Sequence, residues 1–260
     1  MNAVDDYQQM VETVSDLLRQ SKSILFITGA GISAESGLPT YRGIGGLYNE
    51  KLTKDNIPIE VALSGMMMLQ KPEITWTYIS EIEKACRGAK YNYAHEIIAQ
   101  MEQRFGRVWV LTQNVDGFHR DAGSQKLIDI HGDIHSIYCR SCSYSIPKAN
   151  YQELAIPPAC PECRNILRPD VVLFGELLDT EKIAQLGDEL QKGFDIVFSI
   201  GTTSVFPYIS RPVIEAAMRG IPTVEINPSD TEVTRYVSHK FPHGAVQVLG
   251  DIWEELEKNK

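Results

Sequence analysis

Four short, mostly apolar runs in this chain each end in a cluster of small and polar residues. They are Ser23–Thr28 before Gly29-Ala30-Gly31-Ile32-Ser33-Ala34, Val108–Thr112 before Gln113-Asn114-Val115-Asp116, Ile196–Ile200 before Gly201-Thr202-Thr203, and Thr223–Ile226 before Asn227-Pro228-Ser229. Runs of this kind are typical of buried parallel strands. In open α/β sheets, ligands bind beyond the carboxyl ends of such strands. The pattern predicts a Rossmann-like, doubly wound parallel α/β sheet whose strand ends converge on a nucleotide-like ligand.

Helical periodicity between these runs completes an alternating order of strands and helices. Residues 43–90 contain no strand-like run and predict a helical insertion, while residues 134–167 are rich in cysteine, proline and serine and predict a small separate module. These two segments would form a small domain, and residues 1–42, 91–133 and 168–260 the Rossmann-like domain. Further predicted helices are Tyr7–Gln20, Ala94–Phe105, Asp179–Leu190, Pro212–Arg219 and Ile252–Lys258, and further strands are Lys126–Ile130 and Ala245–Leu249.

The first polar cluster matches a phosphate-binding fingerprint. Gly29-x-Gly31-x-x-Ala34 directly follows a predicted strand, and its glycines would let a pyrophosphate approach backbone amides. The fingerprint alone is weak, because a turn that binds no ligand has the same pattern. Ser36-Gly37-Leu38-Pro39 would end the following helix almost at once, unlike the helix of a dehydrogenase. Tyr41 and Arg42 come next and would suit a sugar and a phosphate.

Four of the cysteines have the spacing of a zinc site. Cys139-x-x-Cys142 and Cys160-x-x-Cys163 are separated by 17 residues, which is typical of a zinc ribbon with four thiolate ligands. Such a site has no open coordination position, so the metal would be structural. Chance pairs and redox-active thiols are the alternatives, but neither pair opens a helix after a strand as a redox motif does. The fifth cysteine, Cys86, is predicted to be a plain buried thiol.

Among the histidines, His131 has the position best suited to catalysis. It ends a predicted strand, before Gly132, on the same sheet edge as the nucleotide motifs. An imidazole with a pKa near neutrality can act there as a general base. Of the other five, His119 and His135 are predicted to lie off this edge, and His95, His239 and His243 to be ordinary surface or helix-end residues.

Charge and hydropathy restrict the partners and the compartment. The net charge of -9 argues against a general nucleic-acid binder, which needs a concentrated basic surface. No apolar stretch reaches the roughly 18 residues that a membrane span requires, and the N-terminus does not look like a secretion signal. We therefore expect a cytoplasmic protein without nucleic-acid or membrane partners, and take a monomer as its expected state.

Taken together, these motifs resemble the sirtuins, a family of NAD-dependent protein lysine deacylases. The matching residues run in the family's order from about residue 23 to residue 250, so the resemblance covers nearly the whole chain. They are Gly29-Ala30-Gly31-Ile32-Ser33, Thr112-Gln113-Asn114-Val115-Asp116, His131-Gly132, the two cysteine pairs, Arg168-Pro169-Asp170-Val171-Val172-Leu173-Phe174-Gly175-Glu176, Gly201-Thr202-Thr203 and Ile226-Asn227-Pro228-Ser229. No single motif is decisive, but the ordered set is specific.

The resemblance implies a reaction and two catalytic residues. The carbonyl oxygen of an acyl-lysine would attack sugar carbon C1′ of NAD as nicotinamide leaves, which gives an alkylimidate. His131 would then act as general base on a sugar hydroxyl, and the acyl group would pass to ADP-ribose. Asn114, the other catalytic residue, would hold the nicotinamide ribose and carboxamide together with Asp116. One structural Zn²⁺ would be bound by Cys139, Cys142, Cys160 and Cys163.

The resemblance also implies the binding residues. Gln113 would contact the ribose, Ser33 and Arg42 the phosphates, and Tyr41 would shield the intermediate in place of the family's usual Phe. The full set expected at NAD is Gly29, Ala30, Gly31, Ser33, Glu35, Tyr41, Arg42, Gln113, Asn114, Val115, Asp116, His131, Gly201, Thr202, Thr203, Asn227, Pro228, Ser229 and Ala245. An acyl-lysine peptide would pair by strand addition with a segment that contributes Val172, Phe174, Gly175 and Glu176.

Three features depart from the family pattern. Gly201-Thr202-Thr203 replaces Gly-Thr-Ser, and the loop Ser204–Pro207 is one residue shorter than usual, a change expected to reshape it against the peptide. Sirtuins that remove succinyl groups carry a Tyr-x-x-Arg pair, and the nearest match here, Tyr78-Ile79-Ser80-Glu81, has an acid in place of the arginine. Two carboxylates would repel in a desolvated site. Acetyl and longer uncharged acyl groups are therefore expected over succinyl.

Other functions remain open at this stage. Mono-ADP-ribosyl transfer uses the same cleavage of NAD with a protein nucleophile, and a non-catalytic module would bind NAD without releasing nicotinamide. Retention of Asn114, Asp116 and His131 argues against the non-catalytic module. A zinc-ribbon nucleic-acid binder is disfavoured by the net charge of -9.

Overall fold

The centre of the molecule is a six-stranded sheet in which all paired strands are parallel. The computed structural model describes residues 3–40, 53–147 and 149–258. The chain runs outward from β1 to β2 and β3 and then returns to the other side of β1 at β7, so the topological switch point, where ligands bind, lies between β1 and β7. In spatial order the strands are β3 (Leu127–Asp129), β2 (Arg107–Thr112), β1 (Ser23–Thr28), β7 (Ile196–Ile200), β8 (Thr223–Ile226) and β9 (His239–Phe241).

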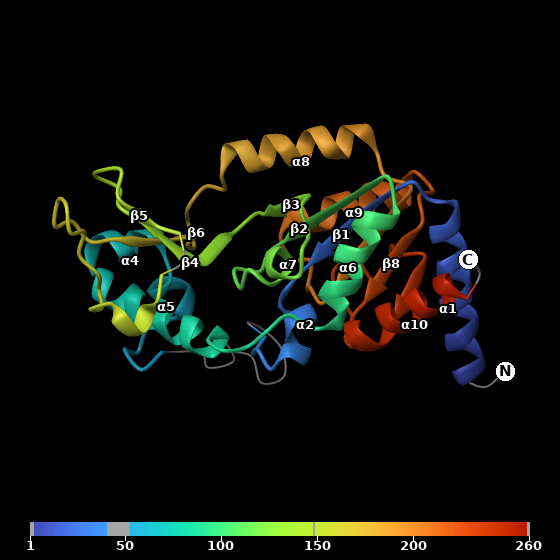
Figure 1. Cartoon of the computed structure of the whole chain (residues 1–260), viewed down its shortest axis with the longest axis horizontal. Coiled ribbons are helices and arrows are strands. Elements are labelled where there is room, and N and C mark those ends of the chain that lie inside the picture. The colour runs from blue at the N-terminus through green and yellow to red at the C-terminus, as the bar shows by residue number, and fades with distance from the viewer. Residues whose placement is uncertain (1–2, 41–52, 148, 259–260) are drawn as a thin grey trace.

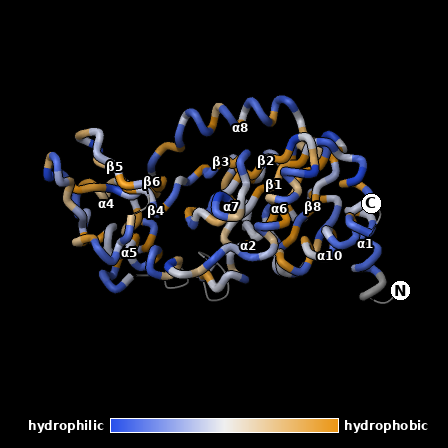
Figure 2. Tube along the Cα trace, in the orientation of Figure 1, coloured by the Kyte–Doolittle hydropathy of each residue, from blue (hydrophilic) through white to orange (hydrophobic). Residues whose placement is uncertain are grey.

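Helices cover both faces of this sheet (Figure 1). The central strands β1 and β7 are buried on both faces, and the middle of the sheet has a hydrophobic colour in Figure 2. Ile24 and Phe26 of β1 pack into the core under one helical layer, and Leu25 and Ile27 into the core under the other. The doubly wound α/β prediction is confirmed. The first layer is α1 (Ala3–Gln20), α6 (Tyr93–Arg104) and α10 (Ala245–Glu257), and the second is α8 (Thr180–Lys192) and α9 (Pro207–Met218).

A second, smaller unit with its own hydrophobic core lies beside the parallel sheet (Figure 1). We call it the small lobe. It consists of helices α3 (Ile59–Ala62), α4 (Gly65–Gln70) and α5 (Pro72–Cys86), the antiparallel sheet β5 (Ser145–Ile146), β4 (Gly132–Tyr138) and β6 (Arg168–Val171), and the 3₁₀ turn η2 (Tyr151–Glu153). The three helices fall within the predicted helical insertion, but the proposed domain boundaries stay a prediction. The short elements α2 (Ala30–Ser33), η1 (Ala34–Ser36) and α7 (Phe118–Asp121) follow β1 and β2.

Two predictions for the C-terminal third are wrong, and one strand was missed. Residues 245–249 are the start of α10 and not a strand, because Ala245, Val248 and Leu249 continue the buried helical stripe of Ile252 and Leu256. The last strand is instead β9, whose three residues are too few to show a period. Helix α9 begins before the predicted Pro212, which lies inside it. A proline removes one backbone hydrogen bond from a helix, and the buried apolar side of α9 outweighs that loss.

Gly31 and Gly201 let the chain segments that follow β1 and β7 pack directly on each other. The amide of Gly31 donates to the carbonyl of Gly201, with an N···O distance of 2.8 Å. A Cβ on Gly31 would lie 2.5 Å from the Cα of Gly201, inside any van der Waals contact. The glycines of the fingerprint are therefore required by contacts within the protein as well as by any ligand.

Replacing Gly31 with alanine is expected to destabilise the fold by about 1–3 kcal/mol, because backbone would have to move to relieve the overlap. Denaturant unfolding monitored by circular dichroism measures this loss. The matched control is Gly187→Ala, since a Cβ on this exposed glycine of α8 meets no atom within 4 Å. That control should gain up to about 1 kcal/mol from the better helix former. Equal stability of the Gly31→Ala variant and the wild type would contradict the close packing.

Each helix in residues 3–40, 53–147 and 149–258 is too short or too polar to span a membrane.

Candidate active site

A cavity of about 660 Å³ opens at the switch point, between the strand ends and the small lobe. This volume is in the range of small-molecule and cofactor sites. The structure brings most of the predicted ligand residues to its wall, although they come from four strand ends and from the small lobe. Those that line it are Gly29, Ala30, Gly31, Glu35, Gln113, Asn114, Val115, His131, Val172, Phe174, Gly175, Glu176, Gly201, Thr202, Thr203, Asn227, Pro228, Ser229 and Ala245.

His131 sits between the two sheets, directly before β4. A Cβ on the next residue, Gly132, would lie 1.9 Å from the carbonyl oxygen of Asp170 in β6, so a glycine is needed for the backbone to pass. The Nδ1 atom of His131 lies 2.9 Å from the carbonyl oxygen of Gln113. Because a carbonyl only accepts, Nδ1 carries the proton of the neutral ring and Nε2 carries the lone pair. Burial lowers the pKa of His131, with a smaller contribution from Lys182. The imidazole is therefore neutral at pH 7.

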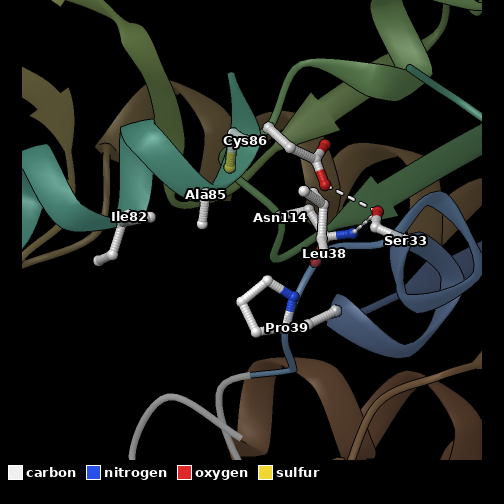
Figure 3. A pocket seen from close by; sticks show the side chains of 9 residues that line it. Ser33, Leu38, Pro39, Ile82, Ala85, Cys86 and Asn114 are labelled. Atoms are coloured by element: carbon white, nitrogen blue, oxygen red, sulfur yellow. Dashed lines mark hydrogen bonds between the residues drawn. The ribbon is translucent and has the colours of Figure 1, made fainter. Parts of the chain in front are cut away.

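Asn114 and Asp116 lie beyond the end of β2, around a smaller pocket that adjoins the main cavity through Ala30 and Asn114 (Figure 3). The Nδ2 atom of Asn114 donates to the carbonyl of Gly29 and to Oγ of Ser33, each at 3.2 Å. Ser33 in turn donates to the Asp116 carboxylate at 2.7 Å. The Oδ1 atom of Asn114 is buried without a hydrogen-bond partner among the described residues. Such an atom is costly unless a ligand or water satisfies it.

The pKa of Asp116 is shifted by its surroundings in the smaller pocket. Burial raises its pKa, and hydrogen bonds from the Phe118 amide and from Ser33 oppose that rise. Cys86 of α5 lines the pocket, and burial raises the pKa of its thiol to about 12. This agrees with the prediction of a plain buried thiol.

The polar residues after β7 and β8 also line the main cavity, at the carboxyl ends of these two strands. Gln113 donates from Nε2 to Oγ1 of Thr202 at 2.7 Å, and Asn227 donates from Nδ2 to the carbonyl of Thr202 at 3.1 Å. Glu35 accepts the amide of Val246 at 2.9 Å and so caps the start of α10. These groups therefore already have partners within the protein, which fix the shape of this part of the cavity.

The segment from Val172 to Glu176 connects His131 to the small lobe. The Val172 amide donates to the carbonyl of His131 at 2.9 Å, and Phe174 exchanges backbone hydrogen bonds with Leu63 and Gly65. Glu176 accepts two hydrogen bonds from the buried Arg168 at 2.7 and 2.8 Å and one from the Leu173 amide. The amides of Val172, Leu173 and Phe174 are thus used inside the protein, so any strand addition must use other backbone groups of this segment.

Comparison with known proteins identifies the family. Residues 29–207 match the model of the Sir2 family. The chain belongs to the Sir2 family. It is 51% identical over 238 residues to an NAD-dependent protein deacylase 2 of Pseudomonas syringae pv. tomato, covering 90% of this chain and 96% of that protein. It is 45% identical over 250 residues to the protein of the same name in Pseudomonas aeruginosa, covering 95% and 97%.

Solved Sir2 structures share the fold of this chain. A complex of a Sir2 homologue with NAD superimposes with a TM-score of 0.81 at 31% identity and covers 95% of this chain and 94% of its own. A Sir2 protein with a deacetylated p53 peptide and 3′-O-acetyl ADP-ribose gives a TM-score of 0.84 at 25% identity, with 94% and 98% covered. These bound molecules belong to those proteins, and they indicate the class of ligand to test here.

Two predicted residues cannot be placed in this Sir2-family protein, and two lie outside the main cavity. Tyr41 and Arg42 fall outside the described residues. Ser33 and Asp116 line the smaller pocket and not the larger one.

The interpretation of Tyr78 and Glu81 as the residues that face the acyl group is wrong. Tyr78 donates to Asp55 at 2.7 Å, and the half-exposed Glu81 pairs with Lys54 at 2.7 Å. Both positions lie on the side of α5 that turns away from the cavity. Ile79 and Ile82, each one residue further along, line the cavity instead. The tyrosine–acid match was therefore out of register by one residue.

Sequence reasoning also missed residues that line the cavity. Phe206 lies in the shortened loop and Tyr208 directly follows it, while His243 precedes the capping Gly244 of α10. His243 lies at a helix end, one of the two positions predicted for it, but it also lines the cavity and is therefore not an ordinary residue of that kind.

The other histidines do not line the cavity. His119 lies off the edge as predicted, fully buried against Oγ1 of Thr28 at 2.9 Å, and burial lowers its pKa well below 6.5. His95 is at a helix end as predicted, but it is fully buried and not at the surface. Its ring packs on those of Phe118 and His119.

The four predicted metal ligands form one cluster in the small lobe. The Sγ atoms of Cys139, Cys142, Cys160 and Cys163 all lie within 4.8 Å of one another. Tetrahedral coordination with Zn–S bonds of about 2.3 Å places sulfur atoms roughly 3.8 Å apart. Backbone and side-chain N–H groups of Ser141 and Asn165 point at two of the sulfurs, a typical support for thiolates. The cluster therefore fits one structural zinc ion.

Removing one of these ligands is expected to abolish zinc binding and destabilise the small lobe. For Cys160→Ser, native mass spectrometry should show loss of one zinc per chain, and the melting temperature should fall by roughly 5 °C or more. Cys86→Ser is the matched control, because Cys86 lies outside the cluster, and should keep its zinc. A Cys160→Ser protein that retained one tightly bound zinc ion would refute the site.

Proposed function

We propose that this chain is an NAD-dependent protein lysine deacylase that transfers the acyl group of an acyl-lysine to ADP-ribose and releases nicotinamide. The observation that carries the proposal is one cavity at the switch point that holds both the neutral imidazole of His131 and the buried Oδ1 of Asn114, which has no partner among the described residues. A sugar hydroxyl can give its proton to the first, and an amide or hydroxyl hydrogen can satisfy the second.

The residues at the wall suit the parts of NAD. Its contribution to the reaction is a sugar carbon from which nicotinamide can leave. Asn114, Ser33 and Asp116 form a polar corner for the carboxamide and the adjoining ribose, beside the apolar Cys86 and Ile82. Gln113 is assigned to the ribose. Thr202, Asn227 and Ser229, which line the cavity after β7 and β8, are assigned to the adenosine half.

His131 is assigned the role of general base. Its Nδ1–H is fixed on the carbonyl of Gln113, which leaves Nε2 to take the proton. Burial lowers the pKa of His131, so the base is in its active, unprotonated form at pH 7. As the pH falls below this depressed pKa, the imidazole becomes protonated and activity should be lost.

The acyl-lysine substrate is assigned to the side of the cavity formed by the small lobe. Val172, Phe174, Gly175 and Glu176 offer it backbone and a tunnel wall. Ile79 and Ile82 give this wall an apolar surface, and no lysine or arginine lines the cavity among the residues that the structure describes. A succinyl carboxylate would be desolvated there with no partner, so uncharged acyl groups are favoured.

We also propose a cytoplasmic location and a monomeric state for this protein. A four-thiolate zinc cluster requires reduced cysteines, which favours the cytoplasm.

The test compares an acetyl-lysine and a succinyl-lysine peptide with NAD, using mass spectrometry of the products. We expect nicotinamide, free lysine and acyl-ADP-ribose in equal amounts, and at least a tenfold preference in kcat/KM for acetyl, or about 1.4 kcal/mol. Peptide carrying ADP-ribose would favour the ADP-ribosyltransferase alternative, and NAD binding without nicotinamide release the non-catalytic one.

The Ile82→Arg variant sharpens the acyl assignment. An arginine at this cavity position would offer a partner to the succinyl carboxylate, so the succinyl-to-acetyl ratio of kcat/KM should rise about tenfold. Glu81→Arg is the matched control, because Glu81 is half exposed and pairs with Lys54 outside the cavity. If Glu81→Arg shifted the ratio and Ile82→Arg did not, the acyl site would lie elsewhere.

A further inference from the structure

Both ring nitrogens of His131 have hydrogen-bond partners in the protein. Nδ1 donates to the carbonyl of Gln113, and Nε2 lies 2.7 Å from the hydroxyl oxygen of Tyr208. Since Nε2 has only its lone pair, the tyrosine O–H is the donor. The atom that would accept the proton from the substrate is therefore already in contact with a phenol.

The sequence of the short loop explains why Tyr208 reaches this position. Gly201 and Ser204 both adopt positive φ angles, 59° and 56°, so the chain turns sharply after β7. Ser204 is held by an amide hydrogen bond to Oγ1 of Thr202 at 3.1 Å. Helix α9 then begins at Pro207, which puts Tyr208 in its first turn. Side chains in a helix point toward its N-terminus, and here that end faces the cavity.

Aromatic packing fixes the phenol once it is there. The rings of Phe206 and Tyr208 stack with centroids 5.4 Å apart and an interplanar angle of 13°. His131 meets both rings edge-on, at 6.1 and 5.9 Å. The contact between Tyr208 and His131 is thus part of a three-ring cluster and not an isolated surface hydrogen bond.

We propose that Tyr208 is a positioning residue for His131, which holds Nε2 by donating a hydrogen bond before the sugar hydroxyl arrives and by accepting one after Nε2 has taken the proton. The kinetic part of this inference rests on the proposed function. A phenol can fill both roles because its oxygen both donates and accepts.

One proton moves in this step, from the sugar hydroxyl to Nε2 of His131. The sugar hydroxyl displaces the phenol from Nε2 and gives its proton to that atom, while its oxygen forms the new bond to the acyl carbon. The resulting Nε2–H then donates to the Tyr208 oxygen, and the phenol keeps its own proton throughout. Burial raises the pKa of Tyr208 to about 12, so the hydroxyl stays un-ionised.

The test uses Tyr208→Phe, which keeps the ring stack and removes only the hydroxyl. We expect kcat for deacylation to fall about tenfold or more, because a hydrogen bond to a charged group is lost. Exchange of labelled nicotinamide into NAD, which precedes the action of His131, and the KM for NAD should stay within about twofold. Tyr236→Phe is the matched control, since Tyr236 packs on Arg235 outside the cavity.

Two kinetic results would overturn the proposal. One is an unchanged or faster kcat in Tyr208→Phe. The other is an equal loss of nicotinamide exchange and deacylation, which would show that the residue acts through packing.

A second readout needs no activity. In ¹⁵N spectra of the protein without substrates, the Nε2 resonance of His131 should move in Tyr208→Phe while the Nδ1 resonance stays, and Tyr236→Phe should change neither. An unmoved Nε2 resonance would contradict the contact. A wild-type protein that freed no lysine would refute the proposed function, and the ¹⁵N comparison would still decide the role of Tyr208 at Nε2.

Discussion

Replacing His131 with alanine is expected to lower the rate of lysine deacylation by about 10²–10⁴-fold, the usual contribution of a general base. The variant should still bind NAD and exchange labelled nicotinamide, because departure of nicotinamide precedes the proton transfer assigned to His131. Deacylation is measured by release of free lysine from an acetyl-lysine peptide, and exchange in the same sample by incorporation of labelled nicotinamide.

The pH dependence of the same variant gives an independent check. The pKa of His131 is lowered by burial, so kcat/KM of the wild type should be constant around neutral pH and fall as the pH drops through this depressed pKa. The acidic fall should be absent from the residual activity of His131→Ala. His239→Ala is the matched control, because His239 lies on the edge strand β9 and does not line the cavity. A His131→Ala enzyme with normal turnover would refute the assignment of the base.

Replacing Asn114 with alanine is expected to reduce both nicotinamide exchange and deacylation by at least about 10²-fold, the cost of removing one preorganised polar group from an active site. Asn114 is buried, and its Nδ2 is fixed by Gly29 and Ser33 so that Oδ1 is left for the ligand. A role in holding the ribose and carboxamide acts before nicotinamide leaves, so both activities should fall together.

Nicotinamide exchange should distinguish the two variants, because His131→Ala should keep it and Asn114→Ala should lose it. Asn150→Ala is the matched control for Asn114, because Asn150 caps a short surface turn in the small lobe, and it should leave both activities unchanged. Circular dichroism should show that Asn114→Ala remains folded. If Asn114→Ala lost deacylation but kept nicotinamide exchange, Asn114 would act in the same step as His131 and the proposed division of roles would be wrong.

The features that sequence predicts well are those in which chemistry and periodicity agree. The apolar runs ending at Thr28, Thr112, Ile200 and Ile226 are strands because each is buried on both faces. Their polar continuations meet because parallel strands end at one edge. The cysteine spacing likewise reports the metal site directly, since two turns are needed to bring four sulfurs within 4.8 Å.

The remaining features depend on contacts between distant segments, which no local pattern encodes. Strand β9 has three residues and forms only by pairing with β8. The residues of α5 that face the cavity were misjudged by one position, because an offset of one residue turns a helix by about 100°. Tyr208 reaches His131 only because Gly201 and Ser204 turn the loop sharply. Its role could not be read from the sequence of the loop alone.

The most direct test is a crystal structure of the wild-type protein with an acetyl-lysine peptide and an NAD analogue that cannot release nicotinamide. We predict that Nε2 of His131 lies about 2.6–3.2 Å from a hydroxyl of the nicotinamide ribose. The acyl carbonyl should lie on the opposite side of that sugar, and the carboxamide near Asn114. An NAD analogue bound in another cavity, or with its ribose out of reach of His131, would contradict it.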